Sequence, residues 1–310
     1  MPGRDFRILS GNLTQTALAS GRPTPKETTI KGHYYPWWQV AILVLLVGWL
    51  YSPILVHLVK QWLDDPNFSH GFFVLAFSLF VFWRDRAKFM QAPLAPSSSG
   101  LLIVVGALAV LIIGVLGAEL FLSRISLLLL IAGMIIYFEG WARFRTVLFP
   151  WAFLFLMVPV PAIVLNQITF PLQLLASKVA SHLLEALDVP VLREGNIIHL
   201  PATSLDVAEA CSGIRSLLSL TALSVIFGYF FENRIAIRIL LAVSSIPIAV
   251  SVNSLRIVGT GLLVQHWDPY RELGFFHTFS GWLIFMTSVG MLLLLHRLLR
   301  LVFSRSGNIP

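Results

Sequence analysis

The segment "AEACSGIRSLLSL", Ala208–Leu220, changes from polar to apolar within a few residues and holds Cys211, the only cysteine of the 310-residue chain. The apolar character then continues to about residue 231. A stretch of roughly 20 apolar residues is long enough to cross a bilayer as a helix. The segment therefore predicts a membrane span that begins just after a thiol.

The same apolar character extends over most of the chain. Hydrophobic residues make up 57% and charged residues 12%, whereas a soluble domain has about 25% charged residues. This composition excludes a soluble globular fold and predicts an all-α polytopic membrane protein. We expect about eight transmembrane helices, at about 37–59, 69–83, 99–117, 122–138, 146–165, 213–231, 236–263 and 276–296.

Basic residues set the expected orientation of these spans. Fifteen of the 22 Lys and Arg residues fall on one side, which the positive-inside rule makes cytoplasmic. They are Arg4, Arg7, Arg22, Lys26, Lys31, Arg84, Arg86, Lys88, Arg143, Arg145, Arg234, Arg238, Arg297, Arg300 and Arg305. Both termini are then inside, in a bacterial inner membrane, and the loops between the other span ends face the periplasm. The net charge of +7 is thus a topology signal, and no nucleic-acid partner is expected.

Three regions are expected along the chain. Residues 1–34 are polar and predict an unstructured cytoplasmic tail, residues 35–300 the transmembrane domain, and residues 301–310 a second cytoplasmic tail. The longest connection, 166–212, is expected in the periplasm. Its first part has apolar residues at helical spacing, which predicts an amphipathic helix lying on the membrane. Its second part, "VLREGNIIHL", alternates and predicts a small β-hairpin that leads to Cys211.

Cys211 is the strongest candidate for chemistry. A thiol at a helix N-terminus has its pKa lowered by the helix dipole and by nearby cations. Arg215, four residues later, lies on the same helical face, and Gly213 lets a substrate backbone approach closely. The alternative is a small, buried, structural cysteine.

Two later spans hold further candidates. Arg256, in "SVNSLRIVGTG", lies inside an apolar run, where a charge costs at least ~2.5 kcal/mol and indicates a functional site. Asn253 precedes it by one turn, and the alternative is an arginine that reaches the headgroups. His277, in "GFFHTFSGW", opens the last span with Ser280 one turn later. His70, in "NFSHG" at the mouth of the second span, is a further candidate for the same site.

The predicted topology brings Cys211, Arg256 and His277 to the same outer face. A thiolate nucleophile needs an acid/base partner and a group that stabilises developing charge, and this set supplies both. A single cysteine, and histidines without metal-ligand spacing, give no support to a metal site. No glycine-rich nucleotide loop is present in the sequence, so we expect neither a metal nor a cofactor.

The segments "VAEACSGIRSL", "NSLRI" and "HTFSGW", in this order, resemble the cysteine, arginine and histidine motifs of the exosortase/archaeosortase family. The segments "DPNFSHG" and "WARFRTVLFPWAFLFLMVPVP" are also similar to family segments, and the resemblance covers roughly 35–300. It implies a membrane cysteine protease or transpeptidase that acts on PEP-CTERM-type proteins. Their C-terminal sorting signal is a short motif, often Pro-Glu-Pro, then a transmembrane helix and a basic tail. The resemblance implies Cys211 as nucleophile, Arg256 as the stabilising cation and His277 as acid/base.

Membrane lipids surround such an enzyme, and an envelope glycan or lipid is a candidate acceptor for the cleaved protein. Three alternatives stay open. A transporter or polysaccharide-export component predicts polar groups at mid-membrane, broken helices and internal symmetry. A non-catalytic scaffold predicts that Cys211→Ala has no effect. A membrane acyltransferase would use Cys211 on lipids. The candidate residues gather at one face and no repeat is visible, which favours the protease/transpeptidase.

Overall fold

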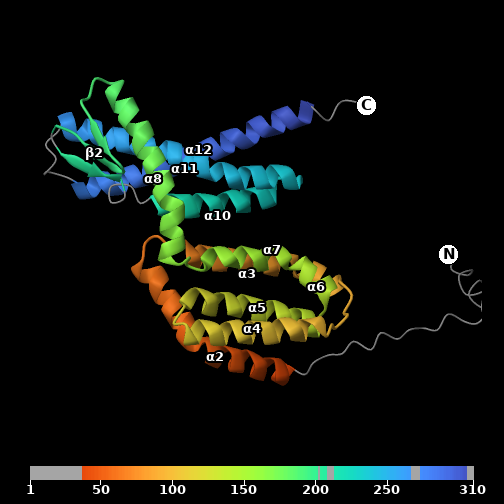
Figure 1. The fold of residues 1–310 in the computed structure, drawn as a ribbon. Coiled ribbons are helices and arrows are strands. Elements are labelled where there is room, and N and C mark those ends of the chain that lie inside the picture. Colours follow the sequence, from red (N-terminus) through yellow and green to blue (C-terminus); the bar gives the residue numbers. More distant parts are fainter. Residues whose placement is uncertain (1–36, 202, 208–212, 267–272, 306–310) are drawn as a thin grey trace, which may run out of the picture. The chain divides into compact units, whose positions relative to one another are not determined.

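The computed structural model describes residues 37–201, 203–207, 213–266 and 273–305. Its helices are α2 (Trp37–Asp64), α3 (His70–Gln91), α4 (Ser99–Leu116), α5 (Leu120–Phe138), α6 (Trp141–Thr146), α7 (Leu148–Phe153), the 3-10 helix η1 (Leu154–Met157), α8 (Ala162–Glu185), α10 (Gly213–Phe231), α11 (Ile235–His266) and α12 (Leu273–Arg305) (Figure 1). The strands are β1 (Leu192–Glu194), β2 (Ile197–His199) and β3 (Ser204–Asp206). The chain divides into two units, Met1–Val47 and Gly48–Pro310, and every contact below lies within the second.

Six of the described helices are long and apolar enough to cross a membrane. They are Trp38–Asp64, Ser99–Leu116, Leu120–Phe138, Ile214–Phe231, Ile235–Gln265 and Phe279–Val302. A bent pair, Leu148–Met157 with Ala162–Glu185, makes a seventh span if it is counted as one. The expected all-α polytopic class is confirmed, and the expected number of eight spans is not.

Two of the expected spans do not appear as single straight helices that are apolar throughout, and each has a physical cause. The span expected at 69–83 is helical in α3, but only its first two thirds are apolar before Arg84 and the charges that follow it. The span expected at 146–165 is not one straight helix, because α7–η1 and α8 meet at 85° across "VPVP". Pro159 and Pro161 lack the N–H that helix continuation requires.

The long connection between α7–η1 and α10 forms a helix and a small sheet. The predicted hairpin is confirmed and gains a third strand, with β1 and β3 both antiparallel to the central β2. Ile198 of β2 and Leu184 of α8 are fully buried against Ile257 and Val258 of α11. The helix and the sheet therefore pack on α11. That α8 lies on a membrane surface stays a prediction.

Helices α10 and α11 form an antiparallel hairpin whose register is defined by two contacts. The Thr221 and Ser245 hydroxyls are 2.8 Å apart. Gly228 lies against Arg238, whose Cα is 3.4 Å from the position that a Cβ on Gly228 would take. Continued along both helices, this register puts Gly213, the first residue of α10, opposite Asn253.

The far end of α10 is held by cations. Arg238 Nε of α11 donates to the Glu232 carbonyl oxygen at 2.7 Å, and Arg300 Nε of α12 donates to Glu232 Oε1 at 3.0 Å. His296 Nε2 lies 3.7 Å from the same carboxylate oxygen. Positive charge at a helix C-terminus is favourable because the carbonyl groups there carry partial negative charge. The cluster joins α10, α11 and α12 at one end.

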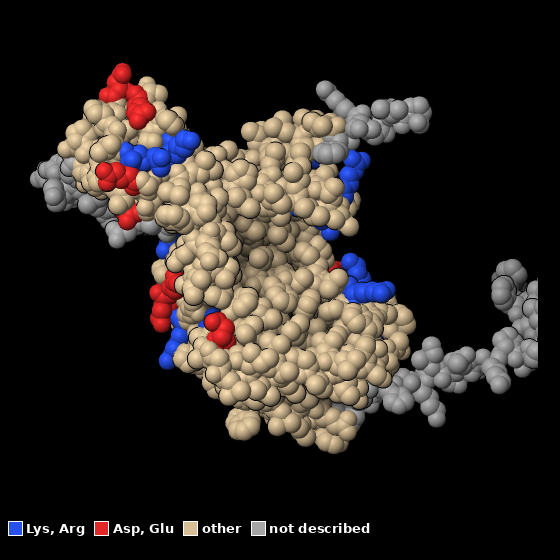
Figure 2. Space-filling model, in the orientation of Figure 1, with Lys and Arg blue, Asp and Glu red and all other residues tan. Residues whose placement is uncertain are grey.

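A second charged cluster joins α3 to α10. The Asp85 carboxylate accepts a hydrogen bond from the Tyr229 hydroxyl at 2.9 Å and pairs with Arg84 and Lys88, each at 3.2 Å. Burial works to raise the pKa of Asp85, but these bonds outweigh it and hold that pKa below its ordinary value. On the face drawn in Figure 2, charged side chains gather in separate groups with a broad uncharged surface between them, as a bilayer requires.

Helices α4 and α5 approach each other closely through glycines. A Cβ on Gly100 would lie 2.3 Å from the Tyr137 amide nitrogen, and one on Gly133 would lie 2.9 Å from that of Val104. Small residues allow such backbone contact between membrane helices, where packing replaces the hydrophobic driving force.

Gly100→Val should destabilise the protein, because the added side chain meets backbone that cannot move aside. Overpacking of this kind costs about 1–3 kcal/mol, so thermal unfolding in detergent should begin at a clearly lower temperature. Gly106→Val is the matched control on the same helix, since nothing lies within 4 Å of its Cβ position. Equal melting temperatures for the two variants would contradict the close α4–α5 contact.

Candidate functional site

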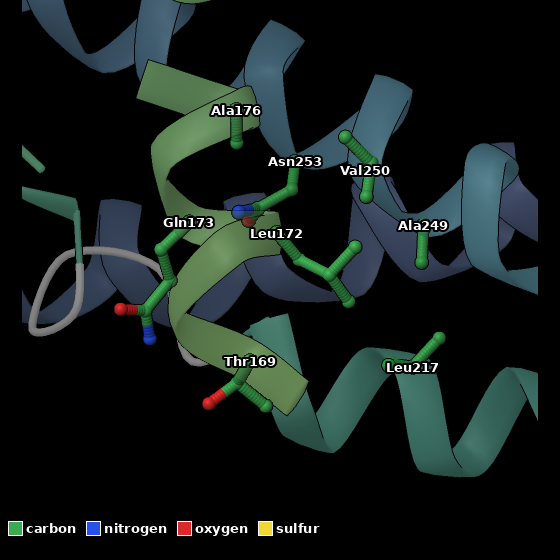
Figure 3. Close-up of a pocket in the computed structure, with 8 residues that line it drawn as sticks. All are labelled: Thr169, Leu172, Gln173, Ala176, Leu217, Ala249, Val250 and Asn253. Carbon is green, nitrogen blue, oxygen red and sulfur yellow. The ribbon is translucent and has the colours of Figure 1, made fainter. Parts of the chain in front are cut away.

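A pocket lies between α8, α10 and α11 and encloses about 370 Å³ of empty space, counting its open side. Its lining consists of Thr169, Leu172, Gln173, Ala176, Leu217, Ala249, Val250 and Asn253 (Figure 3). Five of these side chains are aliphatic and uncharged, and the polar groups are two amides and one hydroxyl. The pocket therefore offers hydrogen bonds but no charge of its own.

Arg256 lies on the face of α11 that lines this pocket. Ala249, Asn253 and Arg256 are spaced i, i+4 and i+7, which puts them on one side of a helix. The Arg256 side chain is buried, with 8% of the residue exposed. Arg215 is exposed instead. It is two positions from Leu217, so it lies on nearly the opposite side of α10 from the pocket.

The helix registers bring three predicted positions to one end of the bundle. Glu232 and His296 are in contact at one end of the bundle. Gly213 lies nineteen residues before Glu232 in the sequence, and His277 lies nineteen residues before His296. At about 1.5 Å per residue, both positions are about 28 Å along their helices from that contact. The antiparallel register puts Asn253 at the same level. In Figure 1 the sheet lies at this end of α11.

Two of the predicted residues cannot be located in full. Cys211 lies outside the described residues. His277 is in the second turn of α12, and nothing is described of its side chain. Ser280, one turn later, is half-buried. Within the described part of the chain, no three His, Cys, Asp or Glu side chains are grouped as metal ligands would be.

Sequence reasoning missed the residues that α8 contributes. Thr169 and Gln173 are one turn apart in "TFPLQLLAS" and line the pocket, with Ala176 beside them. Two polar residues at i and i+4 in an otherwise apolar segment are a signal for a shared polar face. The apolar lining of α10 and α11 has no such signal, because it resembles any packed helix surface.

Both ring nitrogens of His70 lie close to main-chain carbonyl oxygens. Its Nδ1 lies 3.2 Å from the Asn67 carbonyl oxygen, and its Nε2 lies 3.1 Å from that of Leu156. A neutral imidazole donates through one nitrogen only, so both contacts are hydrogen bonds only when the ring is charged. These contacts join the start of α3 to η1. His70 is not among the described residues that line the pocket.

His70→Leu should lower the unfolding temperature in detergent, because a main-chain carbonyl in a partly buried position loses its donor. Leaving such a group unpaired costs about 1–3 kcal/mol. His57→Leu is the matched control, since His57 is exposed on α2. If both variants melt like the unaltered protein, His70 does not hold α3 to η1.

The comparisons with known proteins agree with this architecture. Searches of curated proteins and of solved structures each found no match. The profile of the family described as "Transmembrane exosortase (Exosortase_EpsH)" matches residues 62–294. This range covers well over half of the chain and includes the pocket, Cys211, Arg256 and His277. With its membrane-spanning helices and this match, the chain belongs to the transmembrane exosortase family.

Proposed function

We propose that the protein is a cysteine protease/transpeptidase that cleaves the C-terminal sorting signal of exported proteins through a thioester. One observation carries the proposal beyond family membership. The first residue of α10, the pocket face of α11 with Arg256, and position 277 of α12 are at the same end of the helical bundle. A nucleophile, a cation and an acid/base are the parts that acyl transfer needs.

Chain connectivity supports the inclusion of Cys211 in this site. It precedes Gly213 by two residues, and two residues span at most about 7 Å. The N-terminus of α10 favours a thiolate there, because the partial positive charge of the helix end stabilises negative charge. On the other side, Val207 is fully buried in the cluster of α8, sheet and α11, which anchors the chain four residues before Cys211.

In the first step the Cys211 thiolate attacks the scissile carbonyl carbon and a C–S bond forms. The carbonyl oxygen becomes an oxyanion, whose charge Arg256 stabilises. Collapse of this intermediate breaks the C–N bond, and protonated His277 donates its proton to the leaving amine. The product is a thioester between Cys211 and the exported protein, while the transmembrane helix of the signal leaves.

In the second step water or an amine attacks the thioester carbonyl. Neutral His277 accepts the proton of this nucleophile, the C–S bond breaks and the Cys211 thiolate is restored. Water gives a free carboxylate, and an amine on an envelope glycan or lipid gives a new amide. We place the site at the periplasmic face of a bacterial inner membrane with both termini in the cytoplasm, as the distribution of basic residues supports.

The structure bears on the alternatives in different ways. A small sheet and α8 pack at the end of α11 that holds Arg256, which suits the recognition of a polypeptide outside the membrane. The break between η1 and α8 is a feature that a transporter would share. A transporter and a non-catalytic scaffold, however, would both work without the thiol of Cys211, so one experiment separates them from the protease/transpeptidase.

The test is to express this chain in the same cells as a tagged substrate that ends in a Pro-Glu-Pro-type motif, a transmembrane helix and a basic tail. Co-expression should give a shortened substrate on a blot, and Cys211→Ala should leave the substrate at full length. A substrate without the short motif is the control for unspecific proteolysis. Processing that continues unchanged with Cys211→Ala would remove the nucleophile and the proposal with it.

Arg256→Gln should slow processing about 10²–10³-fold, as loss of an oxyanion-stabilising group does, and Arg256→Lys should retain part of the rate. Arg215→Gln should stay within a few-fold of the unaltered protein, because Arg215 is exposed on another side of α10. Rates are measured in membrane vesicles with enzyme amounts matched by blot. The opposite order of effects would transfer the role to Arg215.

A further inference from the structure

Two amide side chains in the pocket lack a protein partner. Gln173 comes from α8 and Asn253 from α11, eighty residues apart in the sequence. Neither side chain makes a hydrogen bond within the part of the chain that the structure describes. Both residues are half-buried, so their amides are partly open to whatever fills the pocket. Two amides without a protein partner on one largely aliphatic pocket point to a ligand that forms hydrogen bonds with them.

The form of the pocket restricts the chemistry of this ligand. Figure 3 shows the Asn253 amide between α11 and α8, beside Leu172, while the Gln173 amide extends away from it along the other side of α8. The amides thus offer two separate points of contact, which suit an elongated ligand. The other lining residues are apolar apart from Thr169, so the lining offers no charge to a phosphate or to a cation.

A polypeptide backbone in extended form meets these requirements. Each side-chain amide has one carbonyl acceptor and one NH₂ donor, which match the N–H and C=O of a peptide unit. Peptide groups on the same side of an extended chain repeat every two residues, about 6.6 Å apart. An extended segment that leaves water must find partners for these groups, because unpaired backbone groups are costly in an apolar environment.

We propose that Gln173 and Asn253 are positioning residues that hold the backbone of the substrate peptide next to the scissile bond. The inference rests on the proposed function and names its ligand subsite. Asn253 is one turn from Arg256 on the same face of α11, so a backbone bound to Asn253 lies beside the stabilising cation. The aliphatic lining, including Leu217 and Ala249, takes small or apolar side chains of the same segment.

Binding and cleavage are measured separately with the full-length protein in nanodiscs. The ligand is a fluorescent synthetic peptide that contains the Pro-Glu-Pro motif and the transmembrane helix that follows it. In the Cys211→Ala background, Gln173→Leu and Asn253→Leu should each raise the Kd at least 10-fold. With Cys211 present they should raise KM by a similar factor and leave kcat within about threefold. Gln91→Leu, at the exposed last residue of α3, is the control and should change neither constant.

A modified peptide tests for recognition of the backbone itself. Peptides with a single N-methylated amide, moved along the segment before the helix, should include one that binds Cys211→Ala weakly. The same N-methyl group should have little effect in the variant that also lacks the matching amide. A purely structural role of Gln173 or Asn253 would not produce this loss of coupling.

The outcomes separate the two proposals. Unchanged Kd in the leucine variants, while Cys211 still cleaves the peptide, overturns the role of the amides and leaves the protease standing. Tighter binding in the leucine variants also overturns it, because the pocket would then prefer an apolar part of the peptide to its backbone. Cleavage by Cys211→Ala, or no binding to it and no cleavage with Cys211 present, rejects the proposed function together with this inference.

Discussion

The antiparallel register of α10 against α11 is the constraint on which the site depends. The Thr221–Ser245 contact defines it at mid-helix, and Arg238 defines it at the end through the Glu232 carbonyl. A slip of one residue would turn every side chain by about 100°. Asn253 and Arg256 would then leave the pocket face of α11. Leu220 of α10 and Leu241 of α11 are both buried in one apolar cluster, whose packing opposes such a slip.

The interior separates two kinds of polar group. Hydroxyls inside the helices pair with the backbone of the preceding turn, as Ser254 does with the Val250 carbonyl at 2.9 Å and Ser288 with that of Ile284 at the same distance. Such pairing makes a hydroxyl tolerable in an apolar environment without any partner helix. An arginine or a primary amide is less easily satisfied by its own helix. Arg256 and Asn253 are therefore better indicators of function than the many serines around them.

Much of the fold is predictable because hydropathy is a local property. Six spans, the long connection before α10 and its β-hairpin follow from apolar runs and from polar/apolar alternation, which are visible in short windows of the sequence. The 85° bend before α8 does not, since it depends on where α8 finds a surface to pack on. Pro159 and Pro161 permit the bend, but a span that is only kinked and still crosses the membrane would have the same composition, so the sequence does not distinguish the two. The third strand, Ser204–Asp206, is as short as β1 and β2, but the segment before it has no glycine of the kind that marks the β1–β2 turn at Gly195.

The candidate site also contains residues that the sequence alone indicates and residues that only the packing of the helices indicates. Cys211, Arg256 and His277 are candidates from the sequence alone because each is chemically unusual in an apolar chain. Gln173 is missed because its segment has the pattern of a helix on a membrane surface, where an amide would need no explanation. Gln173 becomes a candidate only because α8 packs against α11 and Gln173 then lines the pocket between them.

Helix α8 shows how a closed contact and a pocket arise from one pair of helices. Ala180 and Leu184 are fully buried where α8 meets α11, and Gly261 lies in contact with Leu184. The absence of a side chain at Gly261 leaves room for the Leu184 side chain at this point. About two turns earlier, the larger side chains of Leu172 and Gln173 line a pocket instead. The close contact therefore holds the helix in place, and the part next to it leaves a pocket on the face of α11 that holds Asn253.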